Sequence, residues 1–228
     1  MSALVLSCGR NGTNMMLEIL RGSSVLVATN PAEDKVLFRR SRIVKDNYLS
    51  KCDTTYINNF DQVKNTLNKN KHLKIVWMVR DPRDCALSKI YRGQPGNDGK
   101  TLSDDATFDG CLKSIDWMSK VYKYINKNFS NRIILVKMED IILDFEKTVQ
   151  NVCCFIEVNY EDGMRDFTSR YRVQSKKNRY KNIDKGQVEL YKRFSKIYSG
   201  FYKENKNINI KKLFLRLKPY CELFNYKP

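Results

Sequence analysis

The sequence predicts an α/β fold of three layers, in which helices cover both faces of a central, mostly parallel sheet. Short apolar, β-branched runs alternate along the chain with segments whose apolar residues recur at helical spacing. A strand, a helix and a second strand in this order favour parallel pairing through a right-handed crossover. Open sheets of this kind bind ligands beyond the carboxyl ends of their strands. The alternation therefore predicts the fold class and also the edge of the sheet where a site should lie.

The individual elements follow from the same patterns. Apolar runs bounded by turn or charged residues predict buried strands at 4–7, 24–28, 73–79 and 133–136. Helical spacing predicts helices over 14–21, 61–68, 83–91, 108–125 and 144–156. The turn-rich residues 94–99 belong to a loop reaching about residue 106, long enough to cover a substrate. Beyond residue 160 the strand pattern stops, and basic, aromatic-rich helices are predicted over 187–202 and 210–217.

Size and charge set further bounds. A chain of 228 residues that is 42% hydrophobic suits a single domain, with a core over about 1–160 and a helical, basic part over about 161–228. The 42 Lys and Arg exceed the 25 Asp and Glu, and most of the excess lies beyond residue 164. This charge predicts either a solvated basic face or attraction to nucleic acid, an anionic membrane or a polyanionic small ligand.

Cysteine usage and hydropathy indicate the compartment. The seven cysteines form no C-x-x-C pair, so neither a disulfide framework nor a zinc site is predicted. No apolar run approaches the roughly 18 residues of a membrane span, and no leader pattern precedes the first predicted strand. We expect a cytoplasmic protein without a membrane span, whose thiols are reduced and mostly buried. The sequence carries no signal for the oligomeric state.

The turn after the first predicted strand has the sequence Cys8-Gly9-Arg10-Asn11-Gly12-Thr13-Asn14. Glycine lets the backbone approach a ligand closely, and the N–H groups that begin the next helix attract anions, with Thr13 and Asn14 as side-chain donors. Tight strand-to-helix turns also need glycine for conformational reasons alone, so this stretch by itself leaves both interpretations open. No Lys follows Gly12, although the phosphate loop of ATP- and GTP-binding enzymes requires one.

A second polar segment follows the predicted strand 73–79. Arg80 ends that strand, and Ser88 lies about two helical turns further on, facing the same edge of the sheet. A guanidinium and a hydroxyl held on rigid elements suit a phosphate monoester. The alternative is a structural ion pair between Arg80 and Asp84 or between Arg83 and Asp81.

Taken together, the two segments resemble a known family. G-x-x-G-T after the first strand and R-D-P-R-D-x-x-x-S after a later one resemble the 5′-phosphosulfate and 3′-phosphate signatures of sulfotransferases that use 3′-phosphoadenosine 5′-phosphosulfate (PAPS). The stretch 136–156 is similar to the family's strand, "ED" and helix segment, and Lys185-Gly186 followed by Tyr191-Lys192 is similar to its K-G…W-K element. The resemblance runs in order from about residue 3 to 194, and it implies the P-loop NTPase-like sulfotransferase fold.

The resemblance also implies a reaction and a set of binding residues. It implies transfer of a sulfuryl group from PAPS to a hydroxyl or amine, with 3′-phosphoadenosine 5′-phosphate (PAP) as the product and no metal requirement. It implies that the 5′-phosphosulfate is cradled by Arg10, Asn11, Gly12, Thr13 and Asn14. It implies that the 3′-phosphate is held by Arg80, Ser88, Lys185 and Gly186. Asp184 stands where the family often has Arg, so Arg179 or Lys181 is expected to supply that charge.

A candidate base lies in the stretch 49–54. Lys51 and Asp53, two residues apart in an extended segment, project to the same side. The stretch resembles the K-x-H of cytosolic sulfotransferases, which implies that Asp53 replaces the basic His and that Lys51 and Arg10 are the catalytic cations. The alternatives are a local Lys51–Asp53 ion pair, or Asp53 capping the turn that follows it. Glu33 is the reserve candidate for the base.

Other functions stay open on the residues alone. A nucleotide or small-molecule kinase conflicts with the missing Lys after Gly12. A nucleic-acid-binding protein is suggested by tyrosines among the basic residues beyond 170, but the helical spacing of Tyr191, Phe194 and Tyr198 fits a buried helix face more simply. We expect a carbohydrate or small-molecule acceptor and no nucleic-acid partner. His72 precedes the strand 73–79 and is expected at the opposite edge of the sheet from the ligands.

Overall fold

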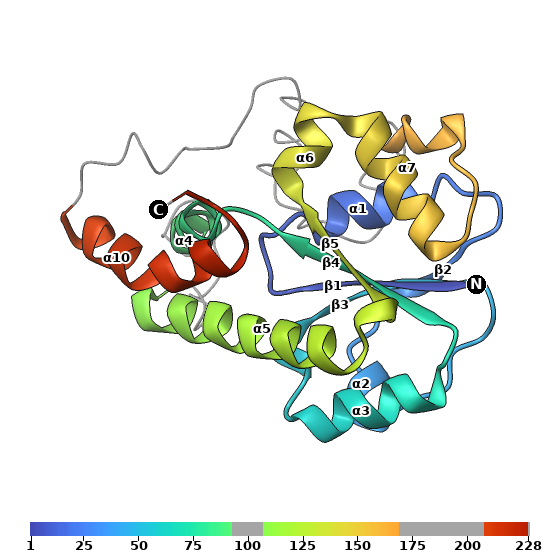
Figure 1. The fold of residues 1–228 in the computed structure, drawn as a ribbon, viewed down its shortest axis with the longest axis horizontal. Helices are drawn as coiled ribbons and strands as arrows, with labels where there is room; N and C mark the ends of the chain where they lie inside the picture. Colours follow the sequence, from blue (N-terminus) through green and yellow to red (C-terminus); the bar gives the residue numbers. More distant parts are fainter. Residues whose placement is uncertain (93–106, 169–207, 228) are drawn as a thin grey trace.

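The computed structural model describes residues 1–92, 107–168 and 208–227, and these form the predicted α/β architecture (Figure 1). Their elements, in chain order, are β1 (Ser2–Ser7), α1 (Thr13–Leu20), β2 (Val27–Glu33), α2 (Leu37–Arg40), β3 (Tyr48–Asp53), the 3₁₀-helix η1 (Thr54–Tyr56), α3 (Phe60–Lys69), β4 (Leu73–Val79), α4 (Pro82–Arg92), α5 (Phe108–Asn128), η3 (Ser130–Arg132), β5 (Ile133–Lys137), α6 (Met138–Leu143), α7 (Phe145–Ile156), η4 (Asp162–Met164) and α10 (Ile208–Leu223). The loop expected up to residue 106 and the helix expected over 187–202 lie outside the described residues.

The central sheet has five strands in the order β2-β3-β1-β4-β5, and every neighbouring pair is parallel. β1 therefore lies in the middle, with Ser7 paired with Asp53 of β3 on one side and Leu6 paired with Trp77 of β4 on the other. The carboxyl ends of β1, β3 and β4 consequently meet at one edge. The predicted parallel sheet is confirmed.

Two strands differ from the sequence prediction. β3 was expected only as an extended segment, because Ser50, Lys51 and Asp53 interrupt its apolar pattern. The strand expected at 24–28 is wrong in position, because β2 begins at Val27 and continues to Glu33 through a shift of register against β3. β2 is an edge strand, where a proline and an irregular register are tolerated.

The alternation of side chains along β1 builds two cores. Leu4 and Leu6 face a cluster formed with α2, α3, α5 and α10, whereas Ala3 and Val5 face a cluster formed with α1, α6 and α7. Figure 1 shows the two groups of helices on opposite sides of the sheet. This arrangement confirms the predicted three layers.

Side-chain caps fix the beginnings of two of these helices. Asn59 Oδ1 accepts a hydrogen bond from the Gln62 N–H at 3.0 Å before α3. Thr107 Oγ1 accepts one from the Gly110 N–H at 3.1 Å before α5. Such caps satisfy N–H groups that have no partner inside the helix, so each helix begins within a residue or so of its predicted start.

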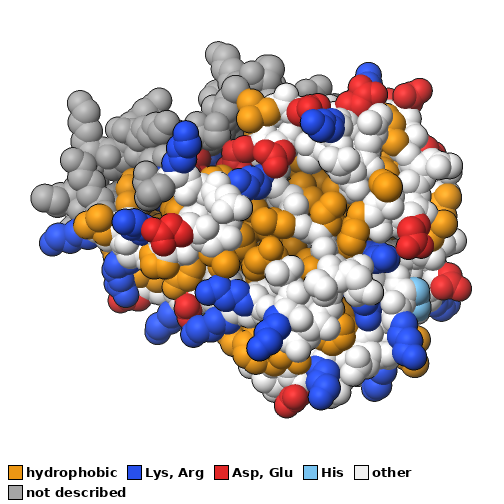
Figure 2. Space-filling view, in the orientation of Figure 1, with side chains coloured by type: hydrophobic (Ala, Val, Ile, Leu, Met, Phe, Trp, Pro, Cys, Tyr) orange, Lys and Arg blue, Asp and Glu red, His pale blue; other side chains and the backbone are white. Residues whose placement is uncertain are grey.

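β5 is the second edge strand of the sheet, on the side away from β2. Ile134 and Leu135 of this strand are only partly buried and pack against the two cores. Figure 2 shows apolar side chains at the surface over this part of the molecule, with Lys and Arg mostly around its margin. On this face of the molecule, the surplus of positive charge is thus not gathered into one patch.

Candidate active site

The loop between β1 and α1 has the backbone of an anion cradle. Arg10 and Gly12 both adopt positive φ angles, of 74° and 83°. Gly12 is the N-cap of α1, no side chain caps this helix, and its first turn holds no acidic residue. The partly exposed Thr13 and Asn14 begin the helix. Helix N–H groups of this kind favour a negative ligand, because the helix dipole is positive at this end.

Asn11 has a different place from its neighbours in the loop. Its side chain is 1% exposed, and its Nδ2 donates to the Cys8 carbonyl oxygen at 3.0 Å. Its Oδ1 accepts the Arg80 N–H at 3.0 Å. The side chain therefore fastens the loop to the end of β4, and the predicted contact of Asn11 with a ligand would have to come from its backbone.

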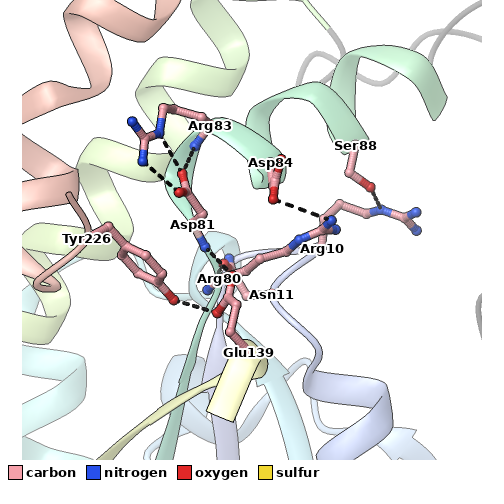
Figure 3. A network of polar contacts seen from close by, with 9 residues as sticks. All are labelled: Arg10, Asn11, Arg80, Asp81, Arg83, Asp84, Ser88, Glu139 and Tyr226. Carbon is pink, nitrogen blue, oxygen red and sulfur yellow. Dashed lines mark hydrogen bonds and ion pairs between the residues drawn. The ribbon is translucent and has the colours of Figure 1, made fainter. Parts of the chain in front are cut away.

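Arg10 and Ser88 lie in direct contact across the site. The Arg10 Nε donates to Ser88 Oγ at 2.9 Å, although 77 residues separate them along the chain (Figure 3). Ser88 lies on α4, two turns from the start of that helix. The two segments predicted to hold opposite ends of one nucleotide are thus brought together.

Arg80 directly follows β4 in the same region and is 8% exposed. One of its guanidinium nitrogens lies 4.0 Å from Asp84 Oδ2, so the alternative ion pair considered from the sequence is present. Arg83 forms the second alternative pair, donating from Nε and Nη2 to the two oxygens of Asp81 at 2.9 and 2.8 Å. These pairs hold the guanidinium groups in fixed positions at the edge of the sheet.

A hydrogen-bond chain supports the segment that carries Arg80. Glu139 Oε1 accepts the Asp81 N–H at 2.9 Å, and Glu139 Oε2 accepts the Tyr226 hydroxyl at 2.7 Å. Arg83 also donates to the Lys227 carbonyl oxygen at 2.6 Å. Burial raises the pKa of Glu139, and burial together with this carboxylate raises the pKa of Tyr226. Figure 3 shows this chain continuing from the residues after α10 to the candidate phosphate site.

The end of β3 carries the candidate base. Lys51 Nζ lies 3.1 Å from Glu33 Oε1, so Lys51 pairs with the reserve candidate across β2 and β3. Asp53 Oδ1 accepts the Thr55 N–H at 2.9 Å and caps η1, as the structural alternative for Asp53 predicted. Its other oxygen, Oδ2, faces Gly9 of the anion loop. Capping therefore uses one carboxylate oxygen and directs the other to the site.

One charged residue of the site was not predicted from the sequence. Lys89 is 4% exposed, and its Nζ donates to Ser114 Oγ of α5 at 3.0 Å. The signal available was its position one turn after Cys85, a residue on the buried side of α4.

The other predicted residues lie away from this site or outside the described part of the chain. Lys185 and Gly186, with Arg179, Lys181 and Asp184, lie outside the described residues. His72 lies at the opposite edge of the sheet, with its Nε2 4.0 Å from Asp46, as expected. In the part of the chain that the structure describes, no group of three or more His, Cys, Asp or Glu residues is arranged to hold a metal ion. No helix in that part is both long and apolar enough to cross a membrane.

Comparisons with known proteins identify related chains. The family profile described as "Sulfotransferase domain" matches residues 2–207. The fold resembles mouse sulfotransferase SULT7A1 complexed with PAP, at 15% identity and a TM-score of 0.62, over 99% of this chain and 85% of that one. It also resembles the sulfotransferase domain of the Synechococcus PCC 7002 olefin synthase, at 13% identity and a TM-score of 0.57, over 100% and 96% of the two chains. Retinol dehydratase in complex with androsterone and inactive cofactor PAP matches at 12% identity and a TM-score of 0.51, over 100% and 82%. Comparison of the sequence with curated proteins finds no significant match.

Proposed function

Because the chain belongs to the family of sulfotransferase domains, we propose that it transfers a sulfuryl group from PAPS to a hydroxyl, or an amine, of a carbohydrate or small-molecule acceptor. The observation that carries the proposal is the contact of Arg10 with Ser88 at 2.9 Å. It supports a single ligand with two negative groups, since cationic and hydroxyl donors from two separate segments meet at one edge of the sheet.

The donor set fits PAPS in its chemistry. Arg10 and the start of α1 would hold the 5′-phosphosulfate, with donors from Gly12, Thr13 and Asn14. Arg80 and Ser88 would hold the 3′-phosphate, and Lys185 and Gly186 are proposed to join them. Two guanidinium groups, a hydroxyl and a helix start that no side chain caps supply donors at one end of the sheet, which suits a ligand that is negative at both ends.

The proposed chemistry needs alignment and charge stabilisation more than covalent help. PAPS supplies the activated sulfuryl group, and Arg10 is proposed to stabilise the negative charge left on the 5′-phosphate, with Lys51 as the second cation. As the acceptor oxygen bonds to sulfur, the bond between sulfur and the 5′-phosphate oxygen breaks and PAP leaves with the electron pair; the O–H bond of the acceptor breaks and its proton passes to Asp53. No metal ion takes part in this scheme.

Ligands of structurally similar proteins and the charge of this chain both bear on the acceptor. The retinol dehydratase structures, with androsterone and with retinol, support a small molecule that bears a hydroxyl group. The excess of Lys and Arg in the sequence supports an acidic sugar equally well. The proposal therefore includes both small molecules and carbohydrates.

Thermal unfolding with nucleotides tests the proposal. PAP at about 100 times its dissociation constant should stabilise the fold by about 2.7 kcal/mol, which raises Tm by about 5–10 °C for a chain of this length. ADP and ATP should give much smaller shifts, because neither carries a 3′-phosphate. Shifts as large with ATP as with PAP, or none with PAP, would overturn the proposal.

Matched variants locate the binding site. Ser88→Ala should weaken PAP binding about tenfold or more, since it removes a hydroxyl proposed to bond a charged phosphate. Ser130→Ala, an exposed serine in η3 at the opposite edge of the sheet, should leave PAP binding unchanged. Arg80→Ala should weaken the PAP shift strongly, and His72→Ala should not change it.

A further inference from the structure

Lys89 is a buried cation next to the proposed catalytic residues. It is 4% exposed, and Ser114 of the neighbouring helix α5 accepts a hydrogen bond from its Nζ at 3.0 Å. A buried ammonium group is costly unless an opposite charge compensates it. A serine hydroxyl supplies a hydrogen-bond acceptor but no charge, so a carboxylate should lie nearby.

The carboxylate that lies nearby is that of Asp53, since both Asp53 and Lys89 lie close to the loop residue Gly9. A Cβ atom on Gly9 would lie 3.4 Å from Asp53 Oδ2 and 3.8 Å from Lys89 Nζ. Two opposite charges, from β3 and α4, therefore flank the same point beside the anion loop. Asp53 Oδ1 is held by the Thr55 N–H at 2.9 Å, so Oδ2 is the oxygen directed to this point.

Four other titratable side chains of the described residues lie around Asp53, and three of them carry no charge at pH 7. A hydrogen bond that the Cys8 thiol makes to Cys85, together with burial, raises the pKa of Cys8, while burial raises the pKa of Cys52 and of Tyr56, so all three are neutral at pH 7. Lys51 lies on the same strand as Asp53 but is paired with Glu33 at 3.1 Å. Lys89 approaches Asp53 from the side of the anion loop, because both side chains lie close to Gly9.

We propose that Lys89 is a positioning residue for Asp53: its ammonium group, anchored on Ser114, holds Asp53 Oδ2 beside Gly9 and keeps the carboxylate ionised to take the acceptor's proton. The inference rests on the proposed function, because it assigns Lys89 a role through the proposed base. Lys89 thus links α4, which carries Ser88, to the strand that carries the base.

The titration of Asp53 tests the inference directly. In protein labelled with ¹³C at aspartate carboxyl carbons, the Asp53 signal is assigned by its loss in Asp53→Asn. Lys89→Met, which keeps the length of the side chain and removes its charge, should raise the titration midpoint of Asp53 by about one pH unit or more. Lys120→Met, which breaks the Lys120–Asp116 ion pair on the exposed side of α5, should leave it unchanged. An unchanged midpoint in Lys89→Met overturns the inference.

A reciprocal measurement covers the case in which Lys89→Met does not fold. Asp53→Asn alters a partly exposed residue and should lower the titration midpoint of the Lys89 ammonium, followed through its ¹⁵Nζ signal. An unchanged Lys89 midpoint counts against the pair. Failure of the proposed function shows separately, as the absence of a PAP shift in the wild-type protein. If PAP raises Tm as expected but Asp53 and Lys89 titrate independently, this inference is refuted and the proposed function is not.

Discussion

Replacing Tyr226 by phenylalanine tests whether the residues after α10 support the candidate phosphate site. The Tyr226 hydroxyl donates to Glu139 Oε2 at 2.7 Å, and the other oxygen of Glu139 accepts the N–H of Asp81, next to Arg80. A hydrogen bond to a charged acceptor contributes about 1.5–3 kcal/mol, and partial burial puts this one near the lower end. Tyr226→Phe should therefore lower Tm by about 3–6 °C.

The same substitution should also weaken PAP binding several-fold, because the Glu139 carboxylate then loses one of the two partners that orient it beside Asp81. Calorimetric titration with PAP and thermal unfolding measure the two effects on one sample. Tyr220→Phe is the matched control, since its hydroxyl donates to Asp116 Oδ1 at 3.0 Å, to a carboxylate whose side chain is 41% exposed. Its loss of stability should be under about 1 kcal/mol, and PAP binding should not change. If Tyr226→Phe binds PAP as tightly as Tyr220→Phe, the support assigned to this segment is wrong.

Two further substitutions test the electrostatics and the backbone of the site. Burial raises the pKa of Glu139 above its usual 4.5, so its contribution to stability is complete below pH 4.5 and is lost as the pH rises through the raised value. The stability of the wild-type protein relative to Glu139→Gln should therefore fall as the pH rises above 4.5, and parallel curves of Tm against pH would contradict this. Gly12→Ala should destabilise the fold by about 1–3 kcal/mol in chemical denaturation, because φ is 83° and the new Cβ would lie 3.3 Å from Met138. Gly9→Ala should cost less, since its Cβ would meet Asp53 at 3.4 Å and no positive φ is required there; equal losses would show that backbone strain is not the cause.

The sequence predicted the parts of the fold that depend on local periodicity. Strand β4 and helix α3 lie where their apolar spacing indicated, because one buried face fixes each pattern. β3 and the true position of β2 were missed for a physical reason. β3 ends in the polar residues of the site, and β2 is an edge strand that does not need an unbroken apolar run.

The candidate site was predicted only where one segment carries its own signal. The anion loop and the segment from Arg80 to Ser88 could be found separately, and the parallel sheet predicted that both lie at the carboxyl ends of the strands. The direct hydrogen bond from Arg10 to Ser88 was not predicted. The burial of Lys89 and the bond from Tyr226 to Glu139 could not be predicted in this way. Both depend on how α5 and the chain after α10 pack on α4 and α6, and no local pattern records such packing.

The middle position of β1 has a consequence for how such a protein can diverge. The loop that follows β1 lies between the ends of two strands. β3, which carries the proposed base, is on one side, and β4, which Arg80 follows, is on the other. Substitutions on the β3 side can therefore change the surroundings of Asp53, the proposed base, while Arg80 and Ser88, proposed to bind the nucleotide, stay the same. Lys89 is the exception, because it lies on α4 with Ser88 and close to Asp53 of β3. A substitution of Lys89 would therefore affect the surroundings of both residues.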